Sequence, residues 1–270
     1  MKKINRCIFC NNNKFKKRFN YTKPVPREIK LKIDYRKYSR YYKSCKICGH
    51  WFSVIKVNLN NLYNKEYVVS TYGDKLNQTF KKIISLPKSK SDNYFRVKRI
   101  LNFSKNFFKK KKKYKLLDVG SGLGVFPYEM KKKGLDCTAL DPDKNASNHI
   151  KNKLKIKTKN IDFFKSKFNK KFNIVTLNKV LEHVENPTKM LKKIKNNLIK
   201  KENFFYIEVP DATEASKINK DREEFAIDHL HVFTLNSLYL LIKNCNFTPI
   251  LIERIKENSN KFTLIAFGKF

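Results

Sequence analysis

Three groups of residues in this sequence have the types and the spacing that chemistry requires. The first is a glycine-rich stretch, Asp118-Val119-Gly120-Ser121-Gly122-Leu123-Gly124. The second is a pair of C-x-x-C motifs, and the third is a set of acids and histidines after residue 180. Glycines can bare main-chain groups to a ligand, paired cysteines can bind a metal ion, and histidines can move protons near neutral pH.

The elements that must position these residues follow from hydrophobic periodicity. Apolar segments typical of strands alternate with amphipathic helices from residue 114 onward, which predicts an α/β domain with a mainly parallel sheet. The strands are expected at 114–119, 135–140, 172–177, 204–209, 250–255 and 262–267, and the helices at 126–133, 144–153, 187–200 and 235–244. A polar stretch, 211–233, interrupts the alternation, and the last two strands form a hairpin-like pair whose final strand is expected to be antiparallel.

The glycine stretch follows directly on the first predicted strand, where open parallel sheets bind their ligands. The order is G-x-G-x-G, with Val125 where the third glycine of a dinucleotide-binding loop would fall. Asp141 ends the next strand and can accept both hydroxyls of a ribose, although it could instead cap the following helix. Asp118 is placed to hold the loop or to meet an ammonium group. A nucleotide-like ligand is therefore predicted.

These residues resemble the class I S-adenosylmethionine-dependent methyltransferases. The phrases Val180-Leu181-Glu182-His183-Val184-Glu185-Asn186-Pro187 and Ile207-Glu208-Val209-Pro210-Asp211 extend the resemblance. It implies a Rossmann-like sheet of seven strands, mostly parallel, whose last strand is antiparallel. In that family the glycine loop cradles the methionine part of S-adenosylmethionine, an acid after the second strand binds the ribose, and residues after the third strand border the adenine. The positions that match are Gly120, Gly122, Gly124, Asp141 and Asp162, joined by Asp118.

Four cysteines near the N-terminus have the spacing of a structural zinc site. Cys7 and Cys10 form one C-x-x-C pair and Cys45 and Cys48 the other, so that two knuckles complete a tetrahedral shell. The gap between the pairs is wider than usual and is expected to form an elongated hairpin in a zinc-ribbon-like module. Empty thiols or a redox pair are the alternatives. His50 is expected to be a bystander. Cys137 and Cys245 are predicted to be small buried residues.

The chain divides into a zinc-binding module at 1–57, a connector at 58–91 with one short helix, and a methyltransferase domain at 92–270. A helix is expected to begin at Asp92, with that residue as its N-cap. A four-cysteine module joined to this core is similar to sugar C-methyltransferases and their relatives, which act on nucleotide-linked sugars or other glycan precursors. Where the best-known members carry His-Glu-His, this chain reads Ile227-Asp228-His229, which leaves transfer to oxygen or nitrogen open.

Methyl transfer needs a group that removes a proton from the acceptor. The candidates for this base are His229 and His231, with Asp228 orienting one imidazole. Glu182 and His183 are expected to line the same face. The alternative for each histidine is a packed loop residue.

Net charge is +38, from 61 Lys and Arg against 23 Asp and Glu. Binding to nucleic acid is one explanation. The other is a genome rich in A and T, because Lys is enriched together with Asn, Ile, Phe and Tyr, whose codons are all rich in these bases. An RNA methyltransferase is therefore the rival hypothesis, since some ribosomal RNA methyltransferases join a four-cysteine module to this fold. Against it, Thr176-Leu177-Asn178-Lys179 lacks the Asn-Pro-Pro-Tyr-like tetrapeptide of base-methylating enzymes. The third hypothesis is a degenerate methyltransferase without activity that serves as a zinc-dependent interaction module.

The sequence contains no run of about 18 apolar residues, so a membrane-spanning helix is not expected. Positive charge at the N-terminus is not followed by an apolar stretch, which argues against a signal peptide. The expected location is the cytoplasm, where paired cysteines are better explained by a metal ion than by disulfides.

Overall fold

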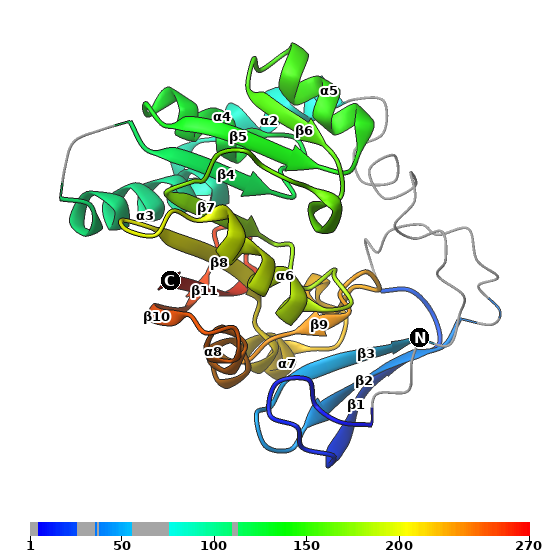
Figure 1. The fold of residues 1–270 in the computed structure, drawn as a ribbon. Helices are drawn as coiled ribbons and strands as arrows, with labels where there is room; N and C mark the ends of the chain where they lie inside the picture. The colour runs from blue at the N-terminus through cyan, green and yellow to red at the C-terminus, as the bar shows by residue number, and fades with distance from the viewer. Residues whose placement is uncertain (1–4, 26–35, 37, 56–75, 110–112) are drawn as a thin grey trace.

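The computed structural model describes residues 5–25, 36, 38–55, 76–109 and 113–270 (Figure 1). Its larger sheet has seven strands and confirms the predicted architecture. In spatial order they are β10 (Thr248–Lys256), β11 (Phe262–Lys269), β8 (Phe204–Pro210), β7 (Ile174–Asn178), β4 (Lys115–Val119), β5 (Asp136–Asp141) and β6 (Lys157–Asn160). Strand β11 is antiparallel to both of its neighbours, β8 and β10, and the other pairings are parallel.

Helices cover both faces of this sheet because its central strands carry apolar side chains at consecutive positions. Leu116 packs toward one face and Leu117 toward the other. The helices on the first face are α2 (Leu76–Ile84), α3 (Asp92–Phe107), α4 (Val125–Lys132) and α5 (Lys144–Asn152). Those on the second face are α6 (Pro187–Ile194) and α8 (Leu235–Asn244).

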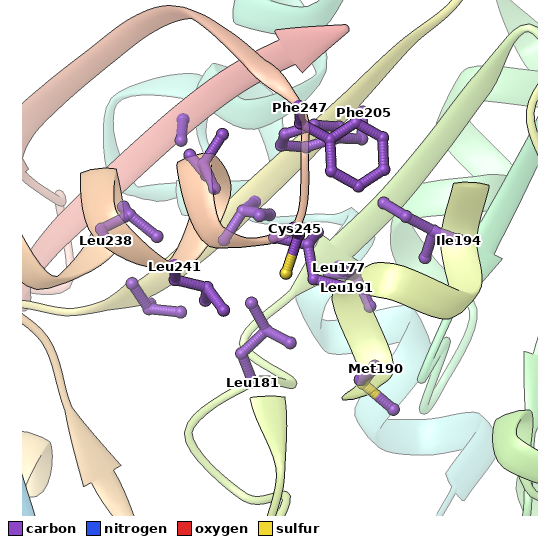
Figure 2. Packing of buried hydrophobic residues seen from close by; sticks show 14 of the residues in the cluster. Leu177, Leu181, Met190, Leu191, Ile194, Phe205, Leu238, Leu241, Cys245 and Phe247 are labelled. Atoms are coloured by element: carbon purple, nitrogen blue, oxygen red, sulfur yellow. The ribbon is translucent and has the colours of Figure 1, made fainter. Parts of the chain in front are cut away.

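The second face is closed by apolar side chains of α6 and α8 over β7 and β8. Figure 2 shows Leu191 and Ile194 of α6 together with Leu241 of α8 near Leu177 and Phe205. Each of these side chains is fully buried, and burying one such side chain contributes about 1.5–3 kcal/mol. Cys245, at the end of α8, lies in the same cluster, and Cys137 lies in the cluster on the opposite face, as expected for small buried residues.

A second, four-stranded sheet combines segments that are far apart in the sequence. Its antiparallel strands are β1 (Phe15–Tyr21), β2 (Arg40–Cys45), β3 (Trp51–Ile55) and β9 (His231–Val232). Strand β9 comes from the stretch that follows β8, and Figure 1 shows it between the large sheet and the N-terminal strands. One face of the smaller sheet packs against α7 (Ala212–Ile218), and the other joins the core beneath α8.

Several local predictions need correction. Ser91, and not Asp92, caps α3, because Tyr94 N donates to the Ser91 hydroxyl at 3.2 Å. Helix α6 ends at Ile194 and continues only as the short 3-10 helix η5 (Lys195–Asn197). Its extension toward Lys200 fails because Asn197 O accepts from Phe172 N instead of closing a further helical turn.

The stretch 211–233, which is polar in sequence, is nevertheless folded. It holds α7, the 3-10 helix η6 (Glu223–Phe225) and buried residues between them. The connector holds the short helix α2, whereas the turn expected at Tyr72-Gly73-Asp74 lies outside the described residues. None of the described helices combines the length and apolar character needed to span a bilayer.

Candidate functional site

The glycine loop leaves the carboxyl end of β4 with three left-handed residues. Gly120, Gly122 and Gly124 have φ values of 70°, 51° and 75°. At Gly120 a Cβ would lie 2.7 Å from Val180 Cγ2, and at Gly124 it would lie 2.7 Å from Ile150 Cγ1. Glycine is therefore required at these two positions by backbone conformation and by packing. These two glycines therefore do not by themselves indicate a bound ligand.

Asp141 ties the loop to the end of β5. Its Oδ2 accepts from Gly122 N at 2.8 Å, and its Oδ1 accepts from Asp143 N at 2.9 Å. Burial raises the pKa of this carboxyl, and the two main-chain donors oppose that effect. Asp143, and not Asp141, caps α5, so the capping interpretation of Asp141 is wrong. Each carboxylate oxygen keeps a further lone pair that can accept from a ribose hydroxyl.

Asp118, the penultimate residue of β4, is buried between β4 and β7. Its Oδ1 accepts from Thr176 Oγ1 at 2.7 Å and from Asn178 Nδ2 at 2.9 Å. Burial raises its pKa from 3.8 to about 6. The Asn178 Oδ1 atom is buried and finds no hydrogen-bond donor among the described residues. An ammonium group from a ligand would supply the missing donor and a counter-charge for Asp118.

Asp162 lies at the same edge of the sheet. It follows β6 by two residues, and Asn160, the last residue of β6, pairs with Asp141. The Asp162 side chain is exposed and caps the 3-10 helix η4 (Phe163–Lys165) by accepting from Phe164 N at 2.6 Å. The predicted contacts Asp118, Gly122, Asp141 and Asp162 therefore line the carboxyl ends of neighbouring strands.

The four predicted cysteine ligands converge in one cluster. Their sulfur atoms all lie within 4.8 Å of one another, with Cys7 to Cys48 at 3.5 Å and Cys10 to Cys45 at 3.4 Å. Four sulfurs at about 2.3 Å from one zinc ion would be ~3.8 Å apart, so the cluster fits a tetrahedral site. The hydrogen bond with Cys48 lowers the pKa of Cys7 to about 5, which favours the thiolate that zinc binds.

His231 and His50 form a buried pair beside this cluster. His231 Nδ1 lies 3.0 Å from His50 Nε2, and His50 Nδ1 lies 3.2 Å from Ser237 Oγ. Burial lowers the pKa of His231 to about 4. Such an imidazole is neutral at pH 7 but too weak a base for efficient proton removal there, and this favours His229 over His231.

Glu182, His183 and His229 meet after the carboxyl end of β7. One ligand atom from each lies within 4.8 Å of the other two, and the two imidazole rings pack edge to face with centroids 4.9 Å apart. His183 Nδ1 donates to Asp228 O at 3.0 Å and lies 3.3 Å from Asp228 Oδ2. Asp228 therefore orients His183, and the Glu224 carbonyl, 2.9 Å from His229 Nδ1, orients His229.

Tyr42 is a contact that the sequence patterns did not single out. This fully buried residue of β2 donates from its hydroxyl to Ala226 O at 3.0 Å and to His229 O at 2.9 Å. The N-terminal sheet therefore holds the main chain that carries His229. Tyr42 lies in a tyrosine-rich stretch without a motif, so only its burial in the folded chain distinguishes it from its neighbours.

Comparisons with known proteins agree with this arrangement. A family model described as a methyltransferase domain matches residues 92–252, more than half of the chain. No curated protein matches the sequence.

Solved structures share the fold at low sequence identity. The plantazolicin methyltransferase BpumL, solved with a triazolic desmethylPZN analogue and SAH, has a TM-score of 0.56 and 15% identity, covering 75% of this chain and 94% of that one. A SAM-dependent methyltransferase from Methanosarcina mazei has a TM-score of 0.51 and 17% identity over 62% of this chain and 96% of that one. The glycopeptide N-methyltransferase MtfA, solved with SAM, has a TM-score of 0.52 and 9% identity over 64% and 93%.

The cysteine cluster gives the first prediction. Cys48→Ser should lower the bound zinc by one equivalent and lower stability by at least about 3 kcal/mol, or ~10 °C in Tm, because the metal holds the N-terminal strands together. Metal analysis and thermal unfolding measure both effects. Cys137→Ala, which removes a buried thiol from the opposite face of the large sheet, should keep its zinc. Full zinc retention by Cys48→Ser would contradict the assignment.

The buried carboxyl of Asp118 gives the second prediction. Its folded-state pKa of about 6 exceeds 3.8, so its stability contribution falls as pH rises through this window. Asp118→Asn keeps the accepting oxygen and cannot ionise, so it should gain up to roughly 3 kcal/mol over the parent protein by pH 7.5 and about half of that at pH 5. Urea unfolding at both pH values measures the difference.

Asp136 provides a control of opposite sign. Its hydrogen bond with Lys157 lowers its pKa, so its contribution to stability is fully present above the unfolded-state pKa. Asp136→Asn should therefore be less stable than the parent protein by nearly the same amount at pH 5 and at pH 7.5. A parent protein more stable than Asp118→Asn at both pH values would show that the buried carboxylate is not destabilising.

Proposed function

The chain belongs to the methyltransferase family whose model matches residues 92–252, and we propose that it transfers a methyl group from S-adenosylmethionine to a small polar acceptor. One observation carries this proposal. The loop with Asp118 and Asp141 and the cluster of Glu182, His183 and His229 follow neighbouring strands at one edge of the same sheet. A donor site and a proton-accepting site are thus adjacent, as an in-line displacement requires.

The donor side fits the proposed cofactor through groups already in place. The Asp141 carboxylate is held by two main-chain donors and would accept from the ribose hydroxyls. Asp118 and the unpartnered Asn178 Oδ1 would accept from the ammonium group of the methionine part. Asp162 would border the adenine. When bound, S-adenosylmethionine supplies a sulfonium methyl group that is open to displacement by a nucleophile.

The acceptor side consists of the histidine cluster. Hydrogen bonds to main-chain carbonyls fix the protonated nitrogen of His229 and of His183 at Nδ1, which directs basicity to Nε2. We assign His229 the contact with the nucleophile of the acceptor, and Asp228 the orientation of His183. Glu182 places a carboxyl group beside both rings.

A nucleotide-linked sugar or glycan precursor, methylated at carbon or oxygen, is the acceptor we favour. Its support is the four-cysteine module joined to this core, a combination similar to sugar C-methyltransferases. The segment that carries His229 contacts both the module and the core. The zinc-binding cysteines suit a reducing compartment, so we place the protein in the cytoplasm.

A groove beside the cysteine cluster favours RNA as a second candidate acceptor. Its described lining includes Lys16, Arg18 and Lys46 and contains no acidic residue. Such a groove would attract phosphates. RNA affinity that falls steeply between low and moderate salt, together with methyl transfer to RNA, would select this candidate over the sugar precursor.

Calorimetry with S-adenosylmethionine and S-adenosylhomocysteine tests the donor site. The zinc-loaded parent protein should bind both. Asp141→Asn should weaken binding by about 10–100-fold, because it removes charge-assisted hydrogen bonds worth about 1.5–3 kcal/mol. Gly122→Ala should also weaken binding, whereas Gly134→Ala is the matched control, since Gly134 has φ 91° but lies outside the loop. A folded parent protein that gives no heat with either ligand would refute the proposed function.

His229→Ala tests the acceptor side. Turnover should fall by about 10²–10⁴-fold while S-adenosylhomocysteine affinity stays unchanged, because the imidazole contacts the acceptor and not the donor. The assay follows label from the donor into cell extract separated into polar metabolites and RNA. His149→Asn, on α5, is the control and should retain turnover. Equal turnover in His229→Ala and the parent would exclude this role.

A further inference from the structure

Glu182 is a buried carboxylate that pairs with no lysine or arginine in the described part of the chain. The residue is 0% exposed, and neither carboxylate oxygen accepts a hydrogen bond from any residue that the structure describes. No Lys or Arg of the described ranges forms an ion pair with it. Isolating an ionised carboxylate from water is unfavourable unless a cation or hydrogen-bond donors replace the water. Within the described part of the chain both oxygens are therefore left available to a ligand.

Two imidazoles stand next to this carboxylate. His183 and His229 each place a ring nitrogen within 4.8 Å of a Glu182 oxygen and of the other ring nitrogen. Ligand atoms at about 2.0–2.2 Å from one cation are ~3.3 Å apart, so the three side chains would need to move inward by at most about 1 Å to bind it. Two imidazole nitrogens and one carboxylate are donors that divalent transition metals prefer.

The hydrogen bonds behind the two rings match those of metal-binding histidines. The Glu224 carbonyl accepts from His229 Nδ1, and the Asp228 carbonyl accepts from His183 Nδ1, which leaves Nε2 as the nitrogen that bears a lone pair in each ring. Metal-ligating histidines usually donate their other ring N–H to a carbonyl or carboxylate in this way.

The Glu224 carbonyl is itself held firmly. The Glu224 carboxylate binds Arg222 through two hydrogen bonds of 2.9 and 2.7 Å and accepts from Phe262 N at 2.7 Å. The main chain behind His229 is therefore fixed by side chains that do not belong to the cluster, so the ring orientation is set before any ligand arrives.

From this geometry we propose that Glu182, His183 and His229 bind a divalent first-row transition-metal cation, at a site separate from the cysteine cluster. Three protein ligands leave at least one coordination position open, where an oxygen of the acceptor would bind and become more acidic. With the cation bound, the Nε2 lone pair of His229 is used for coordination, so His229 would act on the acceptor through the cation and not as a free base. This role toward the acceptor rests on the proposed methyltransferase function. Binding of the cation does not, since it requires neither donor nor acceptor.

Cobalt(II) substitution separates the two metal sites by their ligand chemistry. Thiolate ligands give intense near-ultraviolet charge-transfer bands, whereas a site of nitrogen and oxygen ligands gives only weak visible bands. The full-length protein, stripped of metal and titrated with cobalt(II), should bind two equivalents, and one of them should lack the thiolate bands. Glu182→Gln and His229→Ala should each lose that equivalent and keep the thiolate-bound one.

Controls keep the result independent of folding and of the proposed function. Glu185→Gln removes an exposed carboxylate from the same turn, and His149→Asn removes a distant imidazole, so both should still bind two equivalents. Donor affinity, measured by calorimetry on the same samples, should stay at the parent value in Glu182→Gln. One equivalent in the parent protein, or two in Glu182→Gln, would overturn the proposal whatever the donor affinity.

Discussion

The main chain around Leu230 is hydrogen-bonded to both halves of the molecule at once. Its N–H donates to Glu182 O at 2.8 Å, and its carbonyl accepts from Ser53 N of β3 at 3.0 Å. Three residues later, Phe233 N donates to Pro210 O at the end of β8, and Phe233 O accepts from Ala212 N at the start of α7. Because His229 lies directly before Leu230, its position depends on the large sheet and on the N-terminal sheet together.

This constraint links the cysteine module to the position of His229. Phe9 and Phe52 of the module pack in the same core cluster as Phe233, and Tyr42 donates to the carbonyl of His229. A bound metal ion would add to the apolar contacts of Tyr42 and Trp51 in keeping β1, β2 and β3 in register. Loss of that ion would therefore loosen the histidine segment more than the glycine loop, which is held within the large sheet by β4, β5 and α5.

The sequence predicts the parts of this architecture that are local. The strand and glycine loop at 114–124, the acid at Asp141 and the two C-x-x-C pairs each carry their information within a few residues, and the structure places them as expected. The parts it does not predict depend on distant partners. Tyr42 and His229 are 187 positions apart, and His50 and His231 are 181 apart.

Strand β9 shows the physical reason for this limit. It has only two residues, too few for an alternating pattern, and it pairs because Phe52 and His231 are brought opposite each other by the rest of the fold. The end of α6 is another case, since the Asn197 carbonyl accepts from Phe172 rather than closing a helical turn. Neither competing partner is visible in a local window.

Glu208 and Glu182 show how differently the fold treats two buried carboxylates. Both are 0% exposed. Arg96 Nε donates to Glu208 at 2.7 Å, Arg99 and Tyr206 contact it as well, and although burial opposes ionisation, Arg96 brings the pKa of Glu208 down to about 2. Lys and Arg outnumber Asp and Glu by 61 to 23 in this chain, so cations are plentiful. A buried Glu182 that pairs with no described Lys or Arg is consistent with a counter-charge that arrives with a ligand, because in a structural role it would gain from the neutralisation that Glu208 receives.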